Sequence, residues 1–535
     1  MTVIQPIYDT ASIMPRAVLG PDAEPPVKHV CVVGGGTAGW MTALLLANSS
    51  YGERLQVTVI ESPQVGIIGV GEGSTPWMRG FFDSLGIEEA EWMPECNATY
   101  KAGITFDRWS TRPGFERYFH PFGSMLDNLT MTQFVQNVHA RLEGADVYAH
   151  PDRFFIAHRL ASECRAPRPQ HNFPFDVWYG YHFDAALVGA FLHRKALQRG
   201  VRHVPRHVVS VLQDERGDIA GVQLEGDERF DADFFVDCTG FASLLIGKTL
   251  ETPFVPFTDN LFNDAAIAMP TPLEGPIMTQ TVSTAMDHGW AWKIPLTGRC
   301  GNGYVYSTRF CSADQAETEL RAQLGLLDAD TPARHLKMRV GRVTQSWNRN
   351  CVANGLAQGF IEPLEATALL FVQQTAMKLV DALEKGDIGE DARRGFNDAV
   401  NAQYEGTRDY IVSHYKTNSR TDTEYWRANA ANMHLSDSLA QLLHTWMARK
   451  PLVPGLRKRE FGQAYPIVSW YCLLAGMGVF PNDDLRPPSP KQARYSLAAI
   501  DNLIERSAMN YPDHRTLLQD IPARVKEETL QVYMW

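Results

Sequence analysis

Residues 27–40 read Val-Lys-His-Val-Cys-Val-Val-Gly-Gly-Gly-Thr-Ala-Gly-Trp, and this stretch decides the fold. Val27–Val33 is a short apolar run rich in β-branched residues, which predicts a buried strand. A glycine-rich turn follows, then a predicted helix at Met41–Ala47 and a second predicted strand at Leu55–Ile60. These elements lie within about thirty residues, as in a βαβ unit. The start of the chain therefore predicts an α/β protein with parallel strands.

The glycines of this turn have the spacing of a dinucleotide-binding motif. Gly34 permits a tight turn, Gly36 lets the backbone approach a pyrophosphate, and Gly39 lets the helix sit close to the strand. Thr37 and Ala38 lie at the start of the helix, whose free N–H groups favour phosphate binding. Glu61 ends the second strand, where a carboxylate could accept hydrogen bonds from a ribose hydroxyl. The alternative is an ordinary glycine-rich turn.

A second signal stands at the end of an apolar run, Phe234–Asp237. The run continues as Asp237-Cys238-Thr239-Gly240, a small-residue turn that would suit the neighbourhood of the dinucleotide. The alternative is a strand-to-loop turn capped by the aspartate. A second complete Gly-x-Gly-x-x-Gly is absent from the sequence, so no separate NAD(P)H domain is predicted. If the cofactor is a flavin, its electrons are expected from another protein.

Composition and charge exclude several classes of protein. The 535 residues carry 50 Lys+Arg against 61 Asp+Glu, and this acidic balance argues against a nucleic-acid partner. A hydrophobic content of 44% is that of a globular protein and excludes global disorder. The eight cysteines include no Cys-x-x-Cys pair and are interpreted as mostly buried, reduced thiols in a cytoplasmic protein. No signal peptide is apparent, since the first basic residue is Arg16.

Neither a membrane span nor a metal site is predicted. Phe461–Asn482 carries no charge, but it contains Pro466, Gly476 and Gly478 and favours a buried core segment over a span. His203 and His207 are four apart, but Pro205 between them argues against a helical metal pair.

Further elements follow from hydrophobic periodicity. Strands are expected at Val208–Leu212, Gly221–Leu224 and Phe234–Asp237, and helices at Asp184–Arg199, Ala313–Leu324 and Ala366–Lys385. Beyond Glu390 the chain is expected to be mainly helical. The nucleotide-binding signals are spread over residues 30–370, which indicates a discontinuous cofactor domain.

Three more motifs take the prediction beyond nucleotide binding. They are Gly69-Val70-Gly71-Glu72-Gly73-Ser74-Thr75-Pro76, Trp290-Ala291-Trp292-Lys293-Ile294-Pro295 and Gly359-Phe360-Ile361-Glu362-Pro363-Leu364-Glu365-Ala366-Thr367. Together with the glycine turn, they resemble the flavin-dependent tryptophan halogenase family over nearly the whole chain, from about residue 28 to about residue 480. Trp-x-Trp-x-Ile-Pro is the most specific of the four.

The resemblance implies a fold and its division. The fold would be α/β, with an FAD-binding Rossmann-like domain of the GR2 flavin-monooxygenase type and a largely helical substrate domain. Residues 1–26 would be an N-terminal extension. The FAD-binding domain would comprise residues 27–110, 185–265 and 340–400, and the substrate domain residues 111–184, 266–339 and 401–535.

The resemblance also implies an activity. Reduced FAD, O2 and chloride or bromide would give hypohalous acid, which Lys101 and Glu365 direct onto an electron-rich aromatic ring. A basic amine can hydrogen-bond hypohalous acid as an ammonium or form a haloamine when neutral, and burial would lower its pKa towards that range. The glutamate can orient the electrophile and accept the ring proton. The alternatives are a surface lysine and a first-turn helix charge.

The remaining site residues are carried over from the family's motifs. The halide would lie at Thr367 and Ala368, where the family has Thr-Gly, so the extra methyl group affects the halide pocket. Trp290, Trp292 and Pro295 would form a wall beside the flavin. Trp290 and Trp292 are two residues apart and would point to one face of a strand, so the alternative is that they simply pack in the core. Further cofactor contacts are expected from Gly71, Ser74, Thr75, Pro76, Asp237, Gly240, Gly359, Phe360 and Ile361.

The substrate would be a small aromatic molecule. His120 and Phe122 resemble the family's pair that sandwiches the indole, and Tyr425, Trp426 and Trp470 are candidate further walls. The stretch from 461 to 471 lacks the family's tryptophan-clamping pattern. The substrate could therefore be a simpler indole, a phenol, a pyrrole or a larger indole-bearing molecule.

Partners and rival functions complete the sequence-based prediction. A separate flavin reductase is expected, and a homodimer is compatible with the sequence. The rival functions are a flavin-dependent aromatic hydroxylase and a non-catalytic flavoprotein of a biosynthetic complex.

Overall fold

The computed structural model describes residues 26–50, 52–66, 71–452, 456, 465–481, 484–490, 492 and 496–521. Three sequence predictions fall wholly or partly outside these residues. They are the N-terminal extension up to residue 25, Gly69-Val70 of the second glycine motif, and residues 461–464 and 482 of the uncharged stretch.

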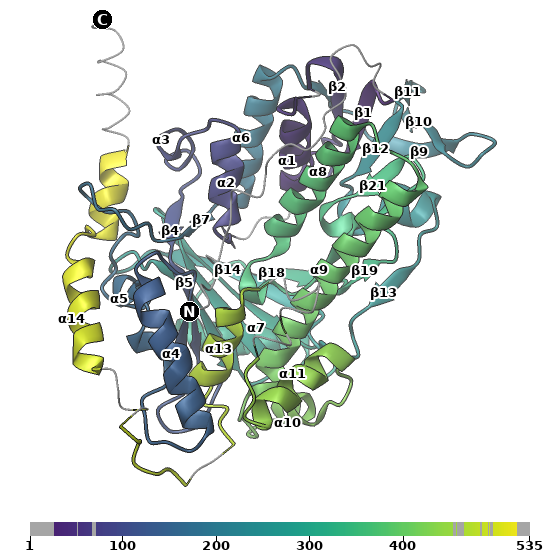
Figure 1. Cartoon of the computed structure of the whole chain (residues 1–535). Coiled ribbons are helices and arrows are strands. Elements are labelled where there is room, and N and C mark those ends of the chain that lie inside the picture. Colours follow the sequence, from purple (N-terminus) through teal and green to yellow (C-terminus); the bar gives the residue numbers. More distant parts are fainter. Residues whose placement is uncertain are drawn as a thin grey trace, which may run out of the picture.

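A six-stranded, mainly parallel sheet carries the glycine turn. Its order is β20-β21-β12-β1-β2-β8, and all neighbours are parallel except β20 and β21. The strands are β1 (His29–Val33), β2 (Gln56–Ile60), β8 (Arg202–Val204), β12 (Phe234–Asp237), β20 (Trp347–Asn348) and β21 (Cys351–Ala353). β1 is an almost unbroken apolar run because both faces of a parallel sheet are covered. Helices α1 (Thr37–Ala47), α6 (Ala185–Gln198) and α8 (Ala368–Lys385) pack together beside it (Figure 1).

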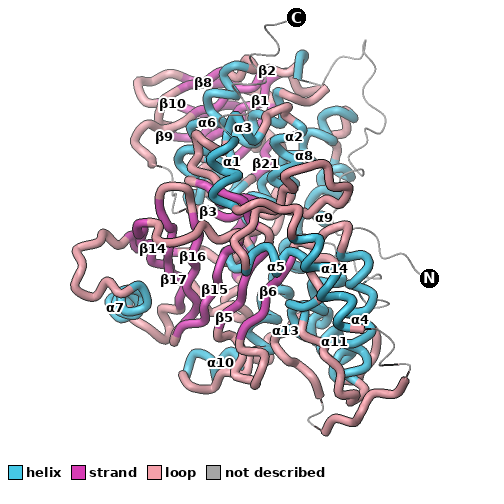
Figure 2. Tube along the Cα trace, turned by 90° about the vertical axis from the view of Figure 1, so that its left-hand side faces the viewer, coloured by secondary structure: helices cyan, strands magenta, loops and turns pink. Residues whose placement is uncertain are grey.

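A seven-stranded sheet forms the second layer of strands. Its order is β18-β14-β17-β16-β15-β5-β6, antiparallel except for β15 with β5 (Figure 2). The strands are β5 (Gly103–Asp107), β6 (Arg117–Pro121), β14 (Ala265–Pro272), β15 (Gln280–Met286), β16 (Gly289–Pro295), β17 (Arg299–Tyr306) and β18 (Arg334–Lys337). The Trp-x-Trp-x-Ile-Pro motif is therefore the body of β16.

The structure has three further sheets of three strands each among its described residues. They are β3 (Glu72–Gly73) with β7 (Gly180–Phe183) and β4 (Thr99–Lys101); β11 (Arg229–Asp231) with β10 (Ile219–Leu224) and β9 (Val208–Gln213); and β13 (Phe254–Pro256) with β19 (Gly341–Val343) and β22 (Gly359–Phe360). The first of them carries Lys101 at the end of β4, next to β5 in the chain.

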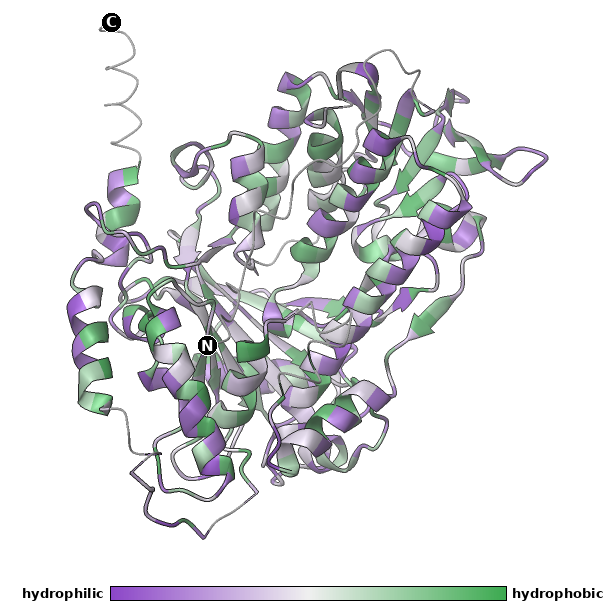
Figure 3. Ribbon diagram, viewed as in Figure 1, coloured by the Kyte–Doolittle hydropathy of each residue, from purple (hydrophilic) through white to green (hydrophobic). Residues whose placement is uncertain are grey.

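Helices dominate the chain beyond Glu390, as predicted. They are α9 (Glu390–Thr417), α10 (Glu424–Ala431), α11 (Asp437–Met447), α13 (Ile467–Gly476) and α14 (Leu497–Ala508). The other helices are α2 (Trp77–Ser84), α3 (Glu89–Trp92), α4 (Asp127–Leu142), α5 (Ile156–Ser162) and α7 (Ala313–Leu324). Outer helices carry both hydrophilic and hydrophobic residues along their length in Figure 3, as expected for helices with one face on the core.

The uncharged stretch is a core element in its described part. α13 is buried from Val468 to Gly476, which confirms the core interpretation for these residues. Within the described ranges, every helix is too short or too polar to cross a membrane. The eight cysteines are all unpaired and mostly buried, which confirms the prediction of free thiols.

Two predicted helix starts are wrong. The helix after the glycine turn, predicted from Met41, begins at Thr37. The sequence predicts a helix from Ala366, with Glu365 at its first turn, but α8 begins at Ala368. Ala366 has a left-handed backbone, with φ of 56°, and this separates α8 from a short 3-10 turn, Pro363–Glu365. Glu365 thus lies on a separate turn and is not a first-turn charge of the helix.

The fold class is confirmed: α/β with a parallel sheet and a helical C-terminal part. Strands of the parallel sheet come from segments scattered between His29 and Ala353. The division into two domains with the boundaries given above remains a prediction.

Candidate active site

The glycine turn leaves open space at the start of α1. A side chain at Gly34 would lie 2.2 Å from the Cys238 carbonyl oxygen, and one at Gly39 would lie 1.9 Å from the Gly34 carbonyl oxygen. A Cβ atom at Gly36, by contrast, would meet no heavy atom of the described residues within 4 Å other than its neighbours in the chain. Gly36 is also the N-cap of α1 and provides no side-chain cap for its first N–H groups. This cradle fits a phosphate-bearing cofactor.

The two acidic residues near the cradle differ in what they contact. Glu61 lies against Gly35, where a Cβ atom would come 2.2 Å from the Glu61 Cδ atom. The Oε2 atom of Glu61 is 3.2 Å from His203 Nε2. Asp237 is fully buried and accepts hydrogen bonds from the backbone N–H groups of Leu245 and Ile246, both at 2.8 Å. The Asp237 side chain therefore caps the turn. Its contact with a cofactor remains a prediction.

Other predicted cofactor residues shape loops beside this sheet. Gly71 has a φ of 82°, and the Ser74 hydroxyl accepts the Tyr181 N–H at 2.9 Å, which ties the loop to β7. Thr75 and Pro76 lead into α2. Further along the chain, Gly240 opens a 3-10 turn, and Gly359, Phe360 and Ile361 lie on or next to β22. In the structure these residues shape the course of the loops and turns, and their contacts with a cofactor remain predictions.

The two tryptophans of the wall lie on β16, two residues apart. Their ring centroids are 6.2 Å apart and both side chains are buried. Pro295 ends the strand, and its carbonyl oxygen accepts the Thr99 hydroxyl at 2.7 Å. Because Thr99 is two residues before Lys101 on β4, the wall is directly linked to the strand that carries the lysine.

Lys101 is completely buried. Its Nζ has no hydrogen-bond partner among the described residues and lies 5.3 Å from the centroid of the Phe122 ring. Burial lowers the pKa of Lys101 to about 7, opposed by the negative charge of Glu365. His182 lies close by and hydrogen-bonds Thr281 at 2.8 Å; burial lowers the pKa of His182 well below its usual value. The lysine therefore sits beside a neutral histidine.

Glu365 lies between two histidines. Its Oε2 is 3.3 Å from His120 Nδ1, and its Oε1 is 3.3 Å from His414 Nε2. Burial favours the protonated carboxyl, but the two histidines outweigh it and lower the pKa of Glu365 to about 2. Sequence reasoning missed His414, which is on α9. Its one signal is the spacing of four residues from Tyr410, which puts both on one helix face.

Aromatic rings surround this glutamate. The Tyr410 ring is 6.0 Å from His120, 4.8 Å from Trp470 and 3.7 Å from Tyr465, with which it stacks. The His120 Nε2 and Trp470 Nε1 atoms are buried without partners among the described residues. The structure thus brings together the predicted residues Lys101, Glu365, His120 and Phe122 with Trp470 nearby, and adds the two tyrosines.

Tyr425 and Trp426 lie beside the other glutamate, Glu362. The Tyr425 hydroxyl donates to Asn263 Oδ1 at 3.0 Å, and Asn263 Nδ2 donates to Glu362 at 2.8 Å. Trp426 donates from Nε1 to the Met286 carbonyl oxygen at 2.8 Å. The proposal that these two aromatic residues contact the substrate remains a prediction, since their hydrogen bonds lead to the Glu362 group.

The predicted halide residues lie where α8 begins. Thr367 is the buried N-cap and makes no side-chain cap, and Ala368 is the exposed first residue of the helix. The N–H groups of the first turn therefore have no side-chain acceptor at the cap position, which suits an anion.

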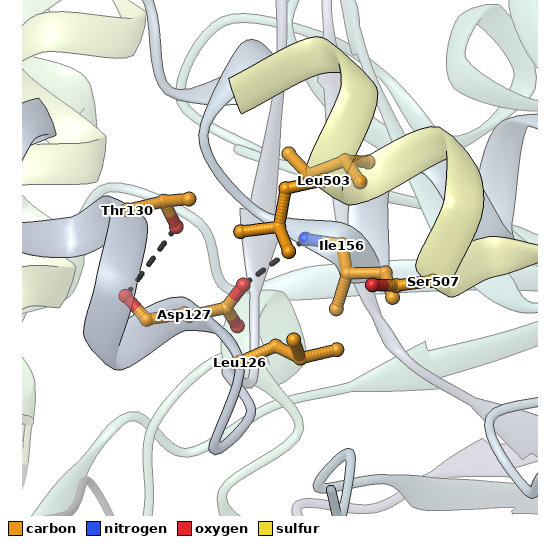
Figure 4. Close-up of a pocket in the computed structure, with 7 residues that line it drawn as sticks. Leu126, Asp127, Thr130, Ile156, Leu503 and Ser507 are labelled. Atoms are coloured by element: carbon orange, nitrogen blue, oxygen red, sulfur yellow. Dashed lines mark hydrogen bonds between the residues drawn. The ribbon is translucent and has the colours of Figure 1, made fainter. Parts of the chain in front are cut away.

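Two pockets lie away from these residues. One, shown in Figure 4, is a tight space beside Asp127, which accepts the Ile156 N–H at 3.1 Å at the start of α5. The other has a volume of about 520 Å³ and is lined in part by Thr105 and Phe119. Phe119 and His120 point to opposite faces of β6, but Tyr118, which shares a face with His120, also lines this cavity.

Three described residues could together hold a metal ion. Ligand atoms of His288, Cys311 and Glu319 lie within 4.8 Å of one another. His288 Nδ1 is already 2.9 Å from Glu319 Oε1, and the Tyr304 hydroxyl donates to Glu319 Oε2 at 2.8 Å. These polar groups are therefore satisfied without an ion. The expectation that the chain uses no metal remains a prediction.

Comparisons with known proteins agree on one family. The family model described as tryptophan halogenase matches residues 29–487. Tryptophan 6-halogenase SttH of Streptomyces toxytricini is 38% identical over 497 residues, covering 88% of this chain and 94% of that protein. Tryptophan 7-halogenase RebH of Lentzea aerocolonigenes is 34% identical over 526 residues, covering 93% and 97%. The solved structure of a tryptophan C-6 flavin-dependent halogenase (chlorinase) from taromycin biosynthesis superimposes with a TM-score of 0.81 at 36% identity, covering 92% and 99%.

Proposed function

Since the chain belongs to the flavin-dependent tryptophan halogenase family, whose members are enzymes, we propose that Lys101 and Glu365 direct hypohalous acid onto an electron-rich aromatic ring. The ring would be an indole or part of an indole-containing compound. The observation that carries the proposal is the buried Nζ of Lys101, which has no hydrogen-bond partner in the described part of the chain, lies beside the Phe122 ring and interacts with the charge of Glu365.

Lys101 would hold the electrophile. With a pKa of about 7, both its ammonium and its neutral amine are populated near neutral pH. The ammonium can donate a hydrogen bond to the oxygen of hypohalous acid, and the neutral amine can take the halogen to give a haloamine with release of water. Since Nζ has no other partner among the described residues, either form is free to act.

Glu365 would act as the base. The ring forms a bond to the halogen as the halogen–oxygen bond breaks, and the ring then loses its proton to the carboxylate. The leaving hydroxide and this proton together make water, so hypohalous acid and the aromatic C–H give the aryl halide and water. His120 and His414 keep the carboxylate ionised, as a base requires.

The cofactor would bind at the glycine cradle. Gly36 and the first N–H groups of α1 would hold its pyrophosphate, and Glu61 would accept hydrogen bonds from a ribose. Reduced FAD, when bound, supplies the reaction of O2 and halide that yields hypohalous acid. Thr367 and Ala368 would bind the chloride or bromide, and a separate reductase would supply the reduced flavin. Trp290, Trp292 and Pro295 would keep the aromatic substrate away from the flavin.

The substrate ring would lie among the aromatic side chains beside Glu365. Its faces would pack against His120, Phe122 and Trp470, which leaves one ring carbon towards Lys101. Membership of the halogenase family gives no support to the two rival functions, a hydroxylase and a non-catalytic flavoprotein.

Mass spectrometry of one reaction mixture tests this function. The mixture would contain purified protein, FAD, a generic flavin reductase, NADH, air, tryptophan or indole, and chloride or bromide. We expect a product with the halogen isotope pattern, which is lost in Lys101→Ala while FAD binding is kept. The matched control is Lys385→Ala, which removes an exposed lysine and should retain activity. Halogenation at a normal rate by Lys101→Ala, or a hydroxylated product from the unaltered protein, would contradict the proposal.

A further inference from the structure

Glu362 is a second buried glutamate on the same turn as Glu365, and the reaction proposed above does not use it. Its side chain is 1% exposed. Asn263 Nδ2 donates to its Oε2 at 2.8 Å, and Trp290 Nε1 and the Tyr415 hydroxyl donate to its Oε1. Both carboxylate oxygens therefore accept hydrogen bonds from N–H donors. One of those donors is the indole of the proposed flavin wall, 3.3 Å away.

The partners of Glu362 are themselves fixed. The Tyr425 hydroxyl donates to Asn263 Oδ1, and Asn263 Nδ2 also donates to the Tyr415 hydroxyl at 2.8 Å. The Asn263 amide therefore cannot turn its oxygen towards Glu362 without losing these hydrogen bonds. A glutamine at position 362 would place an NH2 group against either Asn263 Nδ2 or Trp290 Nε1. A carboxylate is thus the side chain that satisfies both donors.

Neighbouring residues of α9 hold the two glutamates. His414 lies 3.3 Å from Glu365, and the next residue, Tyr415, donates to Glu362. The turn that bears both glutamates ends at Ala366 in a left-handed conformation, which has an energetic cost for a residue with a side chain. The hydrogen bonds to Glu362 hold the start of this turn, and the contacts of Glu365 with His120 and His414 hold its end.

From this geometry we infer that Glu362 is a positioning residue that fixes the Trp290 indole and thereby couples consumption of reduced flavin to halogenation. The inference rests on the proposed function, because it takes Trp290 to be a wall beside the flavin. With the ring fixed, hypohalous acid leaves the flavin by one route, towards Lys101. With the ring loose, part of the oxidised halide or oxygen species escapes, and reduced flavin is consumed without product.

The first test measures the position of Trp290 without flavin or turnover. In protein labelled with 5-fluorotryptophan, the 19F resonance that is missing in Trp290→Phe identifies Trp290. We expect this resonance to shift and broaden in Glu362→Gln, because a glutamine amide cannot accept from both Asn263 Nδ2 and the indole N–H, so the group that fixes the ring is disrupted. Glu319→Gln is the matched control. Glu319 lies on α7 and, like Glu362, has a carboxylate held by ring partners, here His288 and Tyr304. An unchanged Trp290 resonance in Glu362→Gln would overturn the inference.

The second test measures halogenated product per reduced flavin consumed. We expect a fall of about tenfold in Glu362→Gln, the size expected when one buried N–H donor is left without an acceptor. Trp290→Phe lacks the indole N–H and should show a similar fall. The double variant should be no worse than the worse single variant, because both act through one hydrogen bond.

The outcomes separate the two proposals. Losses that multiply in the double variant, or an unchanged product ratio in Trp290→Phe, would overturn the inference. If Glu362→Gln does not fold, Tyr415→Phe removes one donor to Glu362 and should lower the product ratio by a smaller factor, and no change there would also overturn it. If the unaltered protein gives no halogenated product, the proposed function fails, and the 19F test still decides whether Glu362 holds Trp290.

Discussion

Replacing Lys101 by methionine is expected to stabilise the protein, and the gain is expected to shrink as the pH rises. The pKa of this lysine falls from 10.5 in an unperturbed chain to about 7 in the fold. Between these two pH values, Lys101 is therefore protonated in the unfolded chain and mostly neutral in the folded protein. The burial penalty is fully present below about pH 7 and disappears as the pH approaches 10.5. By linkage it amounts to about 5 kcal/mol at low pH.

The assay is denaturant unfolding of the unaltered protein and Lys101→Met at about pH 7 and about pH 9. The difference in unfolding free energy between the two proteins should be about 2 kcal/mol smaller at the higher pH. Lys385→Met, at an exposed position, should show no such dependence. A difference that is the same at both pH values would refute the assignment of a lowered pKa to Lys101. A variant less stable than the unaltered protein at pH 7 would refute the burial penalty.

Five further substitutions have defined outcomes. Glu365→Gln should lower the halogenation rate by about 100-fold or more with FAD binding unchanged, and a normal rate would exclude Glu365 as the base. His120→Asn removes one of the two histidines that lower the pKa of Glu365, so the acid limb of the pH–rate profile should move to higher pH. Gly39→Ala should lose folding or FAD binding because its side chain meets a backbone oxygen, whereas Gly36→Ala should fold and bind FAD more weakly; equal effects in unfolding and FAD titration would contradict the cradle. Ala368→Gly should change the ratio of brominated to chlorinated product in a one-pot competition, and an unchanged ratio would place the methyl group outside the halide pocket.

Local elements of the fold were the predictable ones. The βαβ unit at the glycine turn, the strand Phe234–Asp237 and the helix Ala313–Leu324 follow from patterns within a few residues, and the structure confirms them. The seven-stranded sheet was not predictable in this way. It pairs β5, near residue 105, with β15, near residue 282, and such pairing depends on contacts that no local pattern records.

The start of α8 shows how tertiary contacts override a local pattern. The spacing of apolar residues predicts a helix from Ala366. In the fold, the hydrogen bonds to Glu362 and the contacts of Glu365 with His120 and His414 hold the preceding turn, and Ala366 takes a left-handed conformation instead. The predicted first-turn role of Glu365 fails for this reason.

The candidate site was predictable in part. Lys101 and Glu365 are far apart in the chain, and only the family resemblance suggests that they meet. His120 was predicted as a substrate wall, and the structure also places it against Glu365. His414 was missed because a histidine on a long amphipathic helix has no distinguishing local pattern. Its role depends on which residue the helix faces.

The most direct test of the central claim is the distribution of positional isomers in the halogenated product. The reaction with tryptophan or indole would be compared, by chromatography and mass spectrometry, with the same substrate treated with reagent hypohalite. If Lys101 and Glu365 direct the halogen onto one ring carbon, the enzyme should give predominantly one isomer in proportions that the reagent does not. The same mixture of isomers from both reactions would mean that hypohalous acid reacts free in solution, and it would contradict the claim.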